Sequence, residues 1–275
     1  MNNISRIVGV AFAGFLSLAA TGNATELFSV QFSGPTPLFS VDQTNGSISP
    51  IGPVGIDDIG DLTSDTRAGS FTVWGINIFE NDLVEIDPTT GAAVSSVALD
   101  SEDNMVSLAF DPVSGRLFGN TSVGFGAAAD TLFEIDPTTG NTTLIGEIGF
   151  SDVFALGFDQ NGNLFGIADL TNELISISTL GGNGTFIAGL GVGFAFDIAS
   201  RPEDNTMFLV DSGTTSLYTL DTTNGGLGLI GSYAANSSNL VGLAFSAVPE
   251  PSVLIIFLTA LPGIAVLGRR STRRR

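Results

Sequence analysis

The chain has 275 residues, 28 acidic and nine basic side chains, and a formal net charge of −19. It contains no Cys, no His and no Lys, which excludes disulfides, thiolate chemistry, His-based catalytic triads and Schiff-base lysines. All the acids lie between Glu26 and Glu250, where only three Arg occur, so no nucleic-acid partner is expected.

Residues 1–24 have the pattern of a secretory signal peptide. A short segment with one positive charge, Met1–Arg6, precedes the apolar run Ile7–Ala20, and small residues lead up to Ala24. The alternative is an uncleaved N-terminal membrane anchor. A span needs about 20 apolar residues, however, and this run is shorter. We therefore expect export and a folded domain that begins at residue 25.

A β-hairpin pattern recurs through residues 25–247, which we expect to form one domain without helices. In the clearest copy, Leu132–Ile135 alternates as a strand, Asp136–Gly140 forms a tight turn, and Asn141–Gly146 returns. Gly140, like Gly91 in the preceding copy, is expected to have a positive φ. The five copies start 42 to 49 residues apart, at Leu38, Leu83, Leu132, Leu174 and Leu217.

A second hairpin lies between successive copies, as in Leu108–Gly119 and Leu156–Gly166. Two hairpins per repeat at this period predict an all-β propeller with four-stranded blades and Phe residues packed between them. The first copy has only Leu27–Val30 in place of this hairpin, and the missing strand matches Leu240–Phe245 at the far end. This predicts five blades and a ring closed by the two terminal strands. An open β-solenoid or a two-sheet sandwich is the alternative.

Two acidic clusters are the candidates for a cation site. One contains Asp57, Asp58 and Asp61, and the other contains Asp100, Glu102 and Asp103. Carboxylate oxygens are calcium ligands, but neither cluster has the spacing of an EF-hand loop. We interpret both clusters as solvated loops, and we predict no catalytic residue, metal ligand or cofactor.

A carboxylate also follows Phe in three of the inner hairpins, at Asp111, Asp159 and Asp197. A functional ring of carboxylates is one interpretation. The other is turn capping, because Asp accepts hydrogen bonds from the backbone of the turn that it begins. We favour capping for all three residues.

Residues 248–275 have a tripartite order. Val248–Pro251 contains two prolines, Ser252–Leu267 is apolar, and the chain ends in an Arg-rich segment from residue 269 to residue 275. Physically, this order predicts an extended linker, a short transmembrane helix and a positive segment that stays cytoplasmic. An ordinary C-terminal tail anchor would have a similar outline.

This order resembles the PEP-CTERM sorting signal of bacterial exosortase substrates. The resemblance covers residues 248–275 and implies that Pro249, Glu250 and Pro251 form the sorting motif, with Arg269 and Arg270 in the basic end. It also implies Gram-negative cells that produce exopolysaccharide, passage through the general secretion machinery and processing by an exosortase. The body resembles the repeats of secreted bacterial propellers, which implies no particular activity.

These observations predict an exported, non-enzymatic β-propeller. It would be anchored in the inner membrane during transit and then act at the cell surface or in the extracellular matrix. There it would be an interaction or structural component of biofilm, with an unknown protein or matrix partner. The alternative is a calcium-dependent propeller hydrolase of the lactonase kind.

Overall fold

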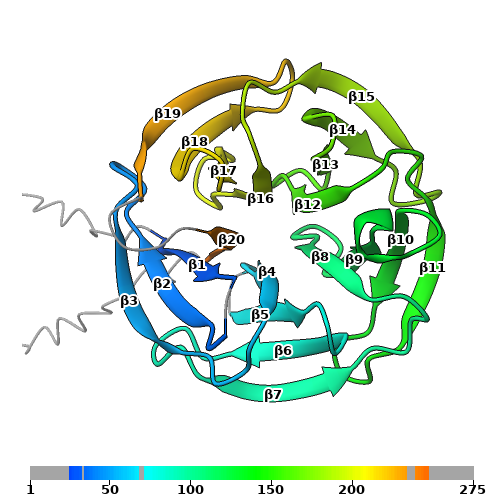
Figure 1. The fold of residues 1–275 in the computed structure, drawn as a ribbon, viewed down its shortest axis with the longest axis horizontal. Coiled ribbons are helices and arrows are strands. Elements are labelled where there is room, and N and C mark those ends of the chain that lie inside the picture. Colours follow the sequence, from blue (N-terminus) through cyan, green and yellow to red (C-terminus); the bar gives the residue numbers. More distant parts are fainter. Residues whose placement is uncertain (1–24, 33, 68–70, 234–238, 248–275) are drawn as a thin grey trace, which may run out of the picture. The chain divides into compact units, whose positions relative to one another are not determined.

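The computed structural model describes residues 25–32, 34–67, 71–233 and 239–247. In this part of the chain, twenty strands form five antiparallel sheets of four strands each, arranged as blades around an axis (Figure 1). The predicted five-bladed propeller is confirmed, and the open solenoid and the sandwich are wrong.

Each blade runs from an innermost strand at the axis to an outermost strand on the perimeter (Figure 1). Blade 1 contains β20 (Leu240–Phe245), β1 (Leu27–Gln31), β2 (Pro37–Val41) and β3 (Ile48–Pro53). Blade 2 contains β4 (Ile59–Asp65), β5 (Thr72–Asn77), β6 (Asp82–Ile86) and β7 (Ala93–Ala98). Blade 3 contains β8 (Met105–Phe110), β9 (Leu117–Thr121), β10 (Thr131–Ile135) and β11 (Thr142–Glu147). Blade 4 contains β12 (Val153–Phe158), β13 (Leu164–Ala168), β14 (Glu173–Ile177) and β15 (Gly184–Gly189). Blade 5 contains β16 (Ala195–Ser200), β17 (Met207–Asp211), β18 (Ser216–Asp221) and β19 (Gly226–Ser232). One 3-10 helix, η1 (Val123–Phe125), follows β9.

The C-terminal strand closes the ring, as the sequence predicts. β20 pairs with β1 in the register Leu27↔Phe245 to Val30↔Gly242, so both ends of the propeller share blade 1. Closure matters because, without β20, one edge of β1 would leave a row of backbone donors and acceptors without partners. All six residues of β20 are buried.

The repeated Asp-to-Gly turns have the conformation that their residues predict. Gly140 has φ +76° and Gly91 has φ +80°, which confirms both predictions. In the turn after β10, Thr138 donates its backbone N–H and its hydroxyl to one carboxylate oxygen of Asp136, at 2.9 and 2.7 Å. These bonds stabilise the ionised carboxylate and lower the pKa of Asp136.

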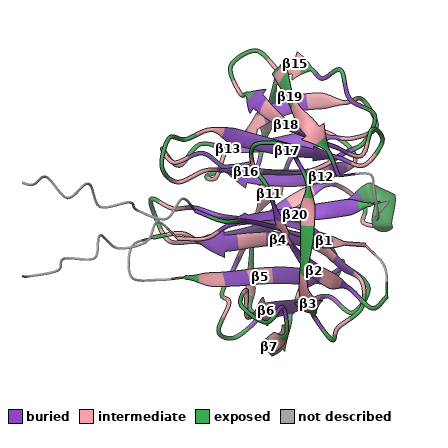
Figure 2. Cartoon of the chain, turned by 90° about the vertical axis from the view of Figure 1, so that its left-hand side faces the viewer, coloured by how far each residue is buried: buried purple, intermediate pink, exposed green. Residues whose placement is uncertain are grey.

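The hydrophobic core is divided into five clusters, and each cluster lies where two neighbouring blades face each other. Phe118 of blade 3 packs on Phe158 of blade 4 with ring centroids 5.4 Å apart, and Phe208 of blade 5 packs on Phe245 of blade 1 at the same distance. Phe residues therefore join the blades, as predicted. Burial falls from the inner strands to the perimeter, where β7 and β15 are largely exposed or intermediate (Figure 2).

The predicted signal peptide, the sorting motif at Pro249–Pro251, the Arg pair at 269 and 270 and the apolar segment 252–267 lie outside the described residues. Within the described ranges, no helix has the length and apolar character needed to cross a bilayer.

Candidate functional site

The five innermost strands surround the propeller axis, and each one contains a β-bulge near the same end of the axis. A bulge inserts one extra residue and redirects its side chain. The residues at these irregularities are Gly60, Val106, Phe154, Phe196 and Val241. All five line one apolar hollow at the end of the axis, together with Phe32, Ile78 and Phe125. We call this opening the aromatic mouth.

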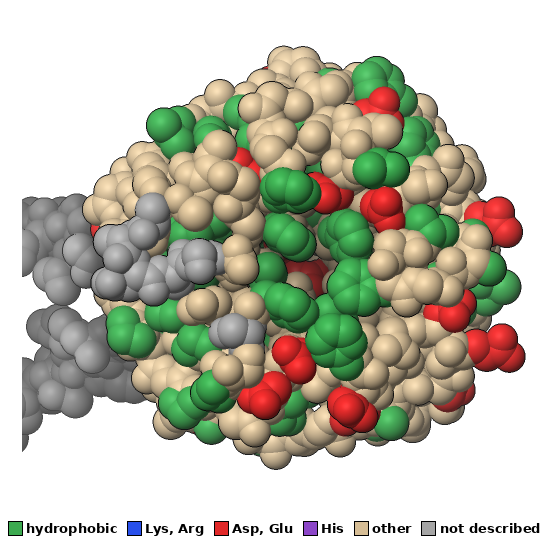
Figure 3. Space-filling view, in the orientation of Figure 1, with side chains coloured by type: hydrophobic (Ala, Val, Ile, Leu, Met, Phe, Trp, Pro, Cys, Tyr) green, Lys and Arg blue, Asp and Glu red, His purple; other side chains and the backbone are tan. Residues whose placement is uncertain are grey.

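The aromatic mouth has a volume of about 50 Å³. Figure 3 shows it as a central hollow with a hydrophobic rim and acidic side-chain atoms at its base. Further acidic side chains surround the rim, and no Lys or Arg is visible on this face. The mouth therefore combines an apolar wall with negative charge.

Five Phe side chains form a continuous chain around the aromatic mouth, one from each blade. The contacts run Phe32–Phe79, Phe79–Phe125, Phe125–Phe154 and Phe154–Phe196, with ring centroids 6.2, 6.3, 5.7 and 6.4 Å apart. Phe79 is 56% exposed and Phe125 is 42% exposed. Exposed, clustered aromatic surface is typical of interaction sites rather than of inert surface.

Two fully buried carboxyl groups, Asp61 of β4 and Asp197 of β16, follow directly after lining residues of the mouth. Asp61 accepts the backbone N–H groups of Leu62 and Leu108, at 2.8 and 2.7 Å. Asp197 accepts those of Ile198 and Leu243, at 2.7 and 2.5 Å. Innermost strands have an unpaired edge toward the axis, and these carboxyls satisfy four of its donors across two blade boundaries.

The two carboxyl groups are also hydrogen-bonded to each other, which requires one of them to hold a proton. Burial is the main cause that raises the pKa of both groups, and the charge of Asp61 raises the pKa of Asp197 further. We infer that the pair shares a proton, which one carboxyl group donates to the other. This pair is a structural centre with every carboxyl oxygen engaged, so it presents no free ligand atoms.

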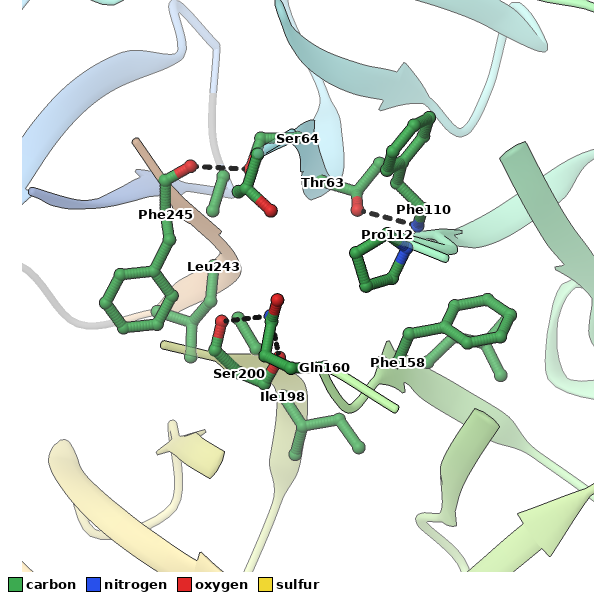
Figure 4. A pocket seen from close by; sticks show the side chains of 15 residues that line it. Thr63, Ser64, Phe110, Pro112, Phe158, Gln160, Ile198, Ser200, Leu243 and Phe245 are labelled. Atoms are coloured by element: carbon green, nitrogen blue, oxygen red, sulfur yellow. Dashed lines mark hydrogen bonds between the residues drawn. The ribbon is translucent and has the colours of Figure 1, made fainter. Parts of the chain in front are cut away.

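The opposite ends of the same innermost strands form a second, polar hollow of about 40 Å³. Figure 4 shows hydroxyl and amide side chains around it, with Gln160 pointing to Ser200. The Gln160 amide donates to the Ser200 hydroxyl at 2.7 Å, and Ser64 donates to the carbonyl of Phe245 at 2.6 Å. These polar groups satisfy each other's hydrogen bonds, whereas the aromatic mouth leaves Phe rings exposed to solvent.

Two carboxylates influence the half-buried Asp169 beside the blade 4 loops. Burial raises the pKa of Asp169 to about 6, with further contributions from the negative charges of Asp152 and Asp211. Asp152 lies near the edge of the aromatic mouth, since a Cβ added to Gly124, the residue before Phe125, would be 2.5 Å from its Oδ1 and 3.0 Å from the Phe154 ring.

The Arg residues of the described ranges are engaged elsewhere. Arg67 and Arg201 form ion pairs with Asp65 and Asp204 at 2.7 and 2.6 Å, and Arg116 pairs with Glu134. Each guanidinium also lies over a Phe ring, at 4.8 to 5.2 Å from its centroid. These Arg residues therefore do not neutralise the mouth.

The residues of the two predicted acidic clusters do not all lie in loops. Asp57, Asp58, Asp100, Glu102 and Asp103 lie in loops, as predicted. Asp100 accepts the backbone N–H and hydroxyl of Thr142 from the next blade, at 2.7 and 2.8 Å. Asp61 does not lie in a loop; it is a buried residue of β4, and that interpretation was wrong. Among the described residues, no three acidic side chains are grouped closely enough to hold a metal ion.

Turn capping is confirmed for Asp111 and Asp159. Asp111 accepts the Val113 N–H at 2.9 Å, and Asp159 accepts those of Asn161 and Asn163 at 2.9 and 2.8 Å. It is wrong for Asp197, which lies within β16 and bonds the neighbouring blade. Turn capping predicts that the strand ends at Asp197, whereas β16 continues to Ser200 after a bulge. The pairing of Asp61 with Asp197 was therefore missed.

Comparisons with known proteins support the fold and little more. No family model matches the chain. Over 128 residues the chain is 31% identical to Protocadherin-16 of Mus musculus, and this alignment covers 42% of the chain and only 4% of that protein. In a crystal structure of a nidogen/laminin complex, one chain has a similar fold, with a TM-score of 0.59 and 12% identity. That match covers 82% of this chain and 100% of the other, so the likeness concerns the β-propeller architecture.

Proposed function

We propose that this chain is an exported, non-enzymatic binding propeller that an exosortase sorts to the cell surface or extracellular matrix. In this proposal it is an interaction or structural component of biofilm or exopolysaccharide material. The tail supplies the sorting function through Pro249, Glu250, Pro251 and the Arg pair at 269 and 270. The membrane helix at 252–267 holds the protein in transit, with the arginines on the cytoplasmic side.

The observation that carries the binding function is the aromatic mouth. Phe79 and Phe125 leave large parts of their rings in water, although each has packed neighbours on one side. A partner would bury this surface at a gain of roughly 25 cal/mol per Å². A complex of nidogen with laminin contains a chain of similar fold, which agrees with a protein-interaction role. The calcium-dependent hydrolase has no specific observation in its favour among the described residues.

The test separates sorting from binding in the native host. A Glu250→Ala variant changes the tail only, and we expect it to accumulate unprocessed in the membrane fraction. A Phe79→Ser/Phe125→Ser variant is expected to be processed normally but to leave the matrix for the medium. Phe186→Ser/Leu144→Ser is the matched control, because these side chains are 53% and 63% exposed on outermost strands.

Fractionation with mass spectrometry of the mature C-terminus measures both steps. A Glu250→Ala protein with the same processed C-terminus as the wild type would contradict the sorting function. Matrix retention that is equal in the aromatic variant and its control would contradict the binding function.

A further inference from the structure

The aromatic mouth is too small for a large organic ligand but suits one side chain. Its volume of about 50 Å³ exceeds the space of a single buried water and is far below that of a drug-sized pocket. Its wall is apolar, formed by Val106, Phe154, Phe196 and Val241, with Phe125 at the rim. A group that enters this hollow is therefore a compact apolar or aromatic side chain.

Among the described residues, no basic side chain balances the negative charge at the rim of the mouth. Asp152 lies beside Gly124 at the edge of the mouth. Burial raises the pKa of Asp169, and the negative charges of Asp152 and Asp211 raise it further. The described Arg residues are held in ion pairs, and none is visible on the face in Figure 3. Positive charge around the inserted side chain would therefore be attracted, both by Coulomb forces and by the faces of the Phe rings.

We propose that the aromatic mouth binds a polypeptide segment of a partner protein that inserts one aromatic or large aliphatic side chain between flanking Lys or Arg residues. This inference rests on the proposed binding function and names its partner class. The inserted side chain fills the hollow, and the flanking cations meet Asp152 and its neighbours. The geometry is that of a central apolar anchor with a charged rim, in which the anchor supplies most of the affinity.

Three short peptides test the proposal on the purified full-length chain in a mild detergent. The probes are acetyl-Gly-Arg-Phe-Arg-Gly-amide, its Ser-Phe-Ser counterpart and its Arg-Ser-Arg counterpart. Binding is measured by calorimetry, with detergent micelles alone as the blank. We expect the first probe to bind saturably and at least tenfold tighter than either counterpart, and its binding to weaken at 0.5 M NaCl.

Variants of the protein locate the site. We expect Phe79→Ser/Phe125→Ser to weaken the Arg-Phe-Arg peptide at least tenfold, and Phe186→Ser/Leu144→Ser to leave its affinity unchanged. Asp152→Asn, which keeps the shape of the side chain, should reduce both the affinity and its salt dependence. Equal binding of the Ser-Phe-Ser peptide would overturn the cationic requirement. Equally tight binding of benzyltrimethylammonium, a small organic cation, would overturn the polypeptide partner.

The outcome is separable from that of the proposed function. If no peptide binds while the Phe79→Ser/Phe125→Ser variant still loses matrix retention, the mouth is a binding site and this partner class is wrong. If the peptide binds at the mouth while retention is unchanged, this inference stands and the matrix function is wrong.

Discussion

The close approach of neighbouring blades at Gly140 predicts a large and testable cost of a single methyl group. Gly140 has φ +76°, and a Cβ there would lie less than 3.0 Å from the carbonyl oxygen of Ala98 in blade 2. Gly149 has the same φ, yet a Cβ there would meet nothing within 4 Å. Gly191 does not have a positive φ, and a Cβ there would also meet nothing within 4 Å. Substitution of each by Ala therefore separates backbone strain from the blade contact.

The magnitudes follow from these two terms. The left-handed conformation costs an Ala about 1–2 kcal/mol, which is the whole effect expected for Gly149→Ala. Gly140→Ala adds overpacking against backbone, worth about 1–3 kcal/mol, so its total is about 2–5 kcal/mol. Gly191→Ala should stay within about 0.5 kcal/mol of the wild type. For a domain of this size, each kcal/mol lowers the melting temperature by about 2–4 °C.

Urea unfolding followed by Trp fluorescence is the assay. Trp74 is the single Trp of the chain and stacks on Phe110 at 5.6 Å, across the boundary between blades 2 and 3. The Gly140–Ala98 contact lies at the same boundary, so the probe reports on the interface that the substitution disturbs. Equal losses of unfolding free energy in Gly140→Ala and Gly149→Ala would show that the blade contact contributes nothing and refute the reasoning.

Three further predictions concern the axis, the closure and the surface charge. The folded-state pKa values of Asp61 and Asp197 are raised, so the folded protein binds more protons than the unfolded chain between about pH 4 and 7. The stability that the two groups contribute is therefore full below about pH 4 and is lost as the pH rises. For one proton, the free energy of unfolding falls by up to about 1.4 kcal/mol per pH unit. Asp197→Asn should flatten this slope in chemical unfolding across that range, and an unchanged slope would contradict the shared proton. Deletion of Leu240 to Ser246 removes a fully buried strand with several large side chains, each worth about 1.5–3 kcal/mol, so cooperative melting should be lost; an unchanged melt by circular dichroism would contradict the closure. Millimolar calcium should raise the melting temperature only slightly and without saturation, and a stoichiometric binding isotherm would instead support a metal site.

The sequence alone determined the architecture of this protein, because the signals for it are local and repeated. Strand alternation, Asp-to-Gly turns and a period of 42 to 49 residues define the blades, and the unmatched strands at the two ends define the closure. The positive φ of Gly91 and Gly140 follows from turn chemistry within a few residues. The contact of Gly140 with Ala98 does not, since it depends on how one blade meets the next.

Only the tertiary structure decided the candidate site, because its residues come from different blades and meet only where the blades come together. The Phe residues of the aromatic mouth come from unlike positions: Phe32 after β1, Phe79 after β5, Phe125 in η1, and Phe154 and Phe196 at bulges. They occupy two different places in the repeat, the loop after the second strand in blades 1 to 3 and the innermost-strand bulge in blades 4 and 5, so no single motif marks them. Asp61 and Asp197 likewise belong to strands of different blades and meet only because the ring closes around one axis. A bulge shifts each strand by one residue, and this shift, invisible in the residue pattern, turned a predicted turn cap into the buried centre of the propeller.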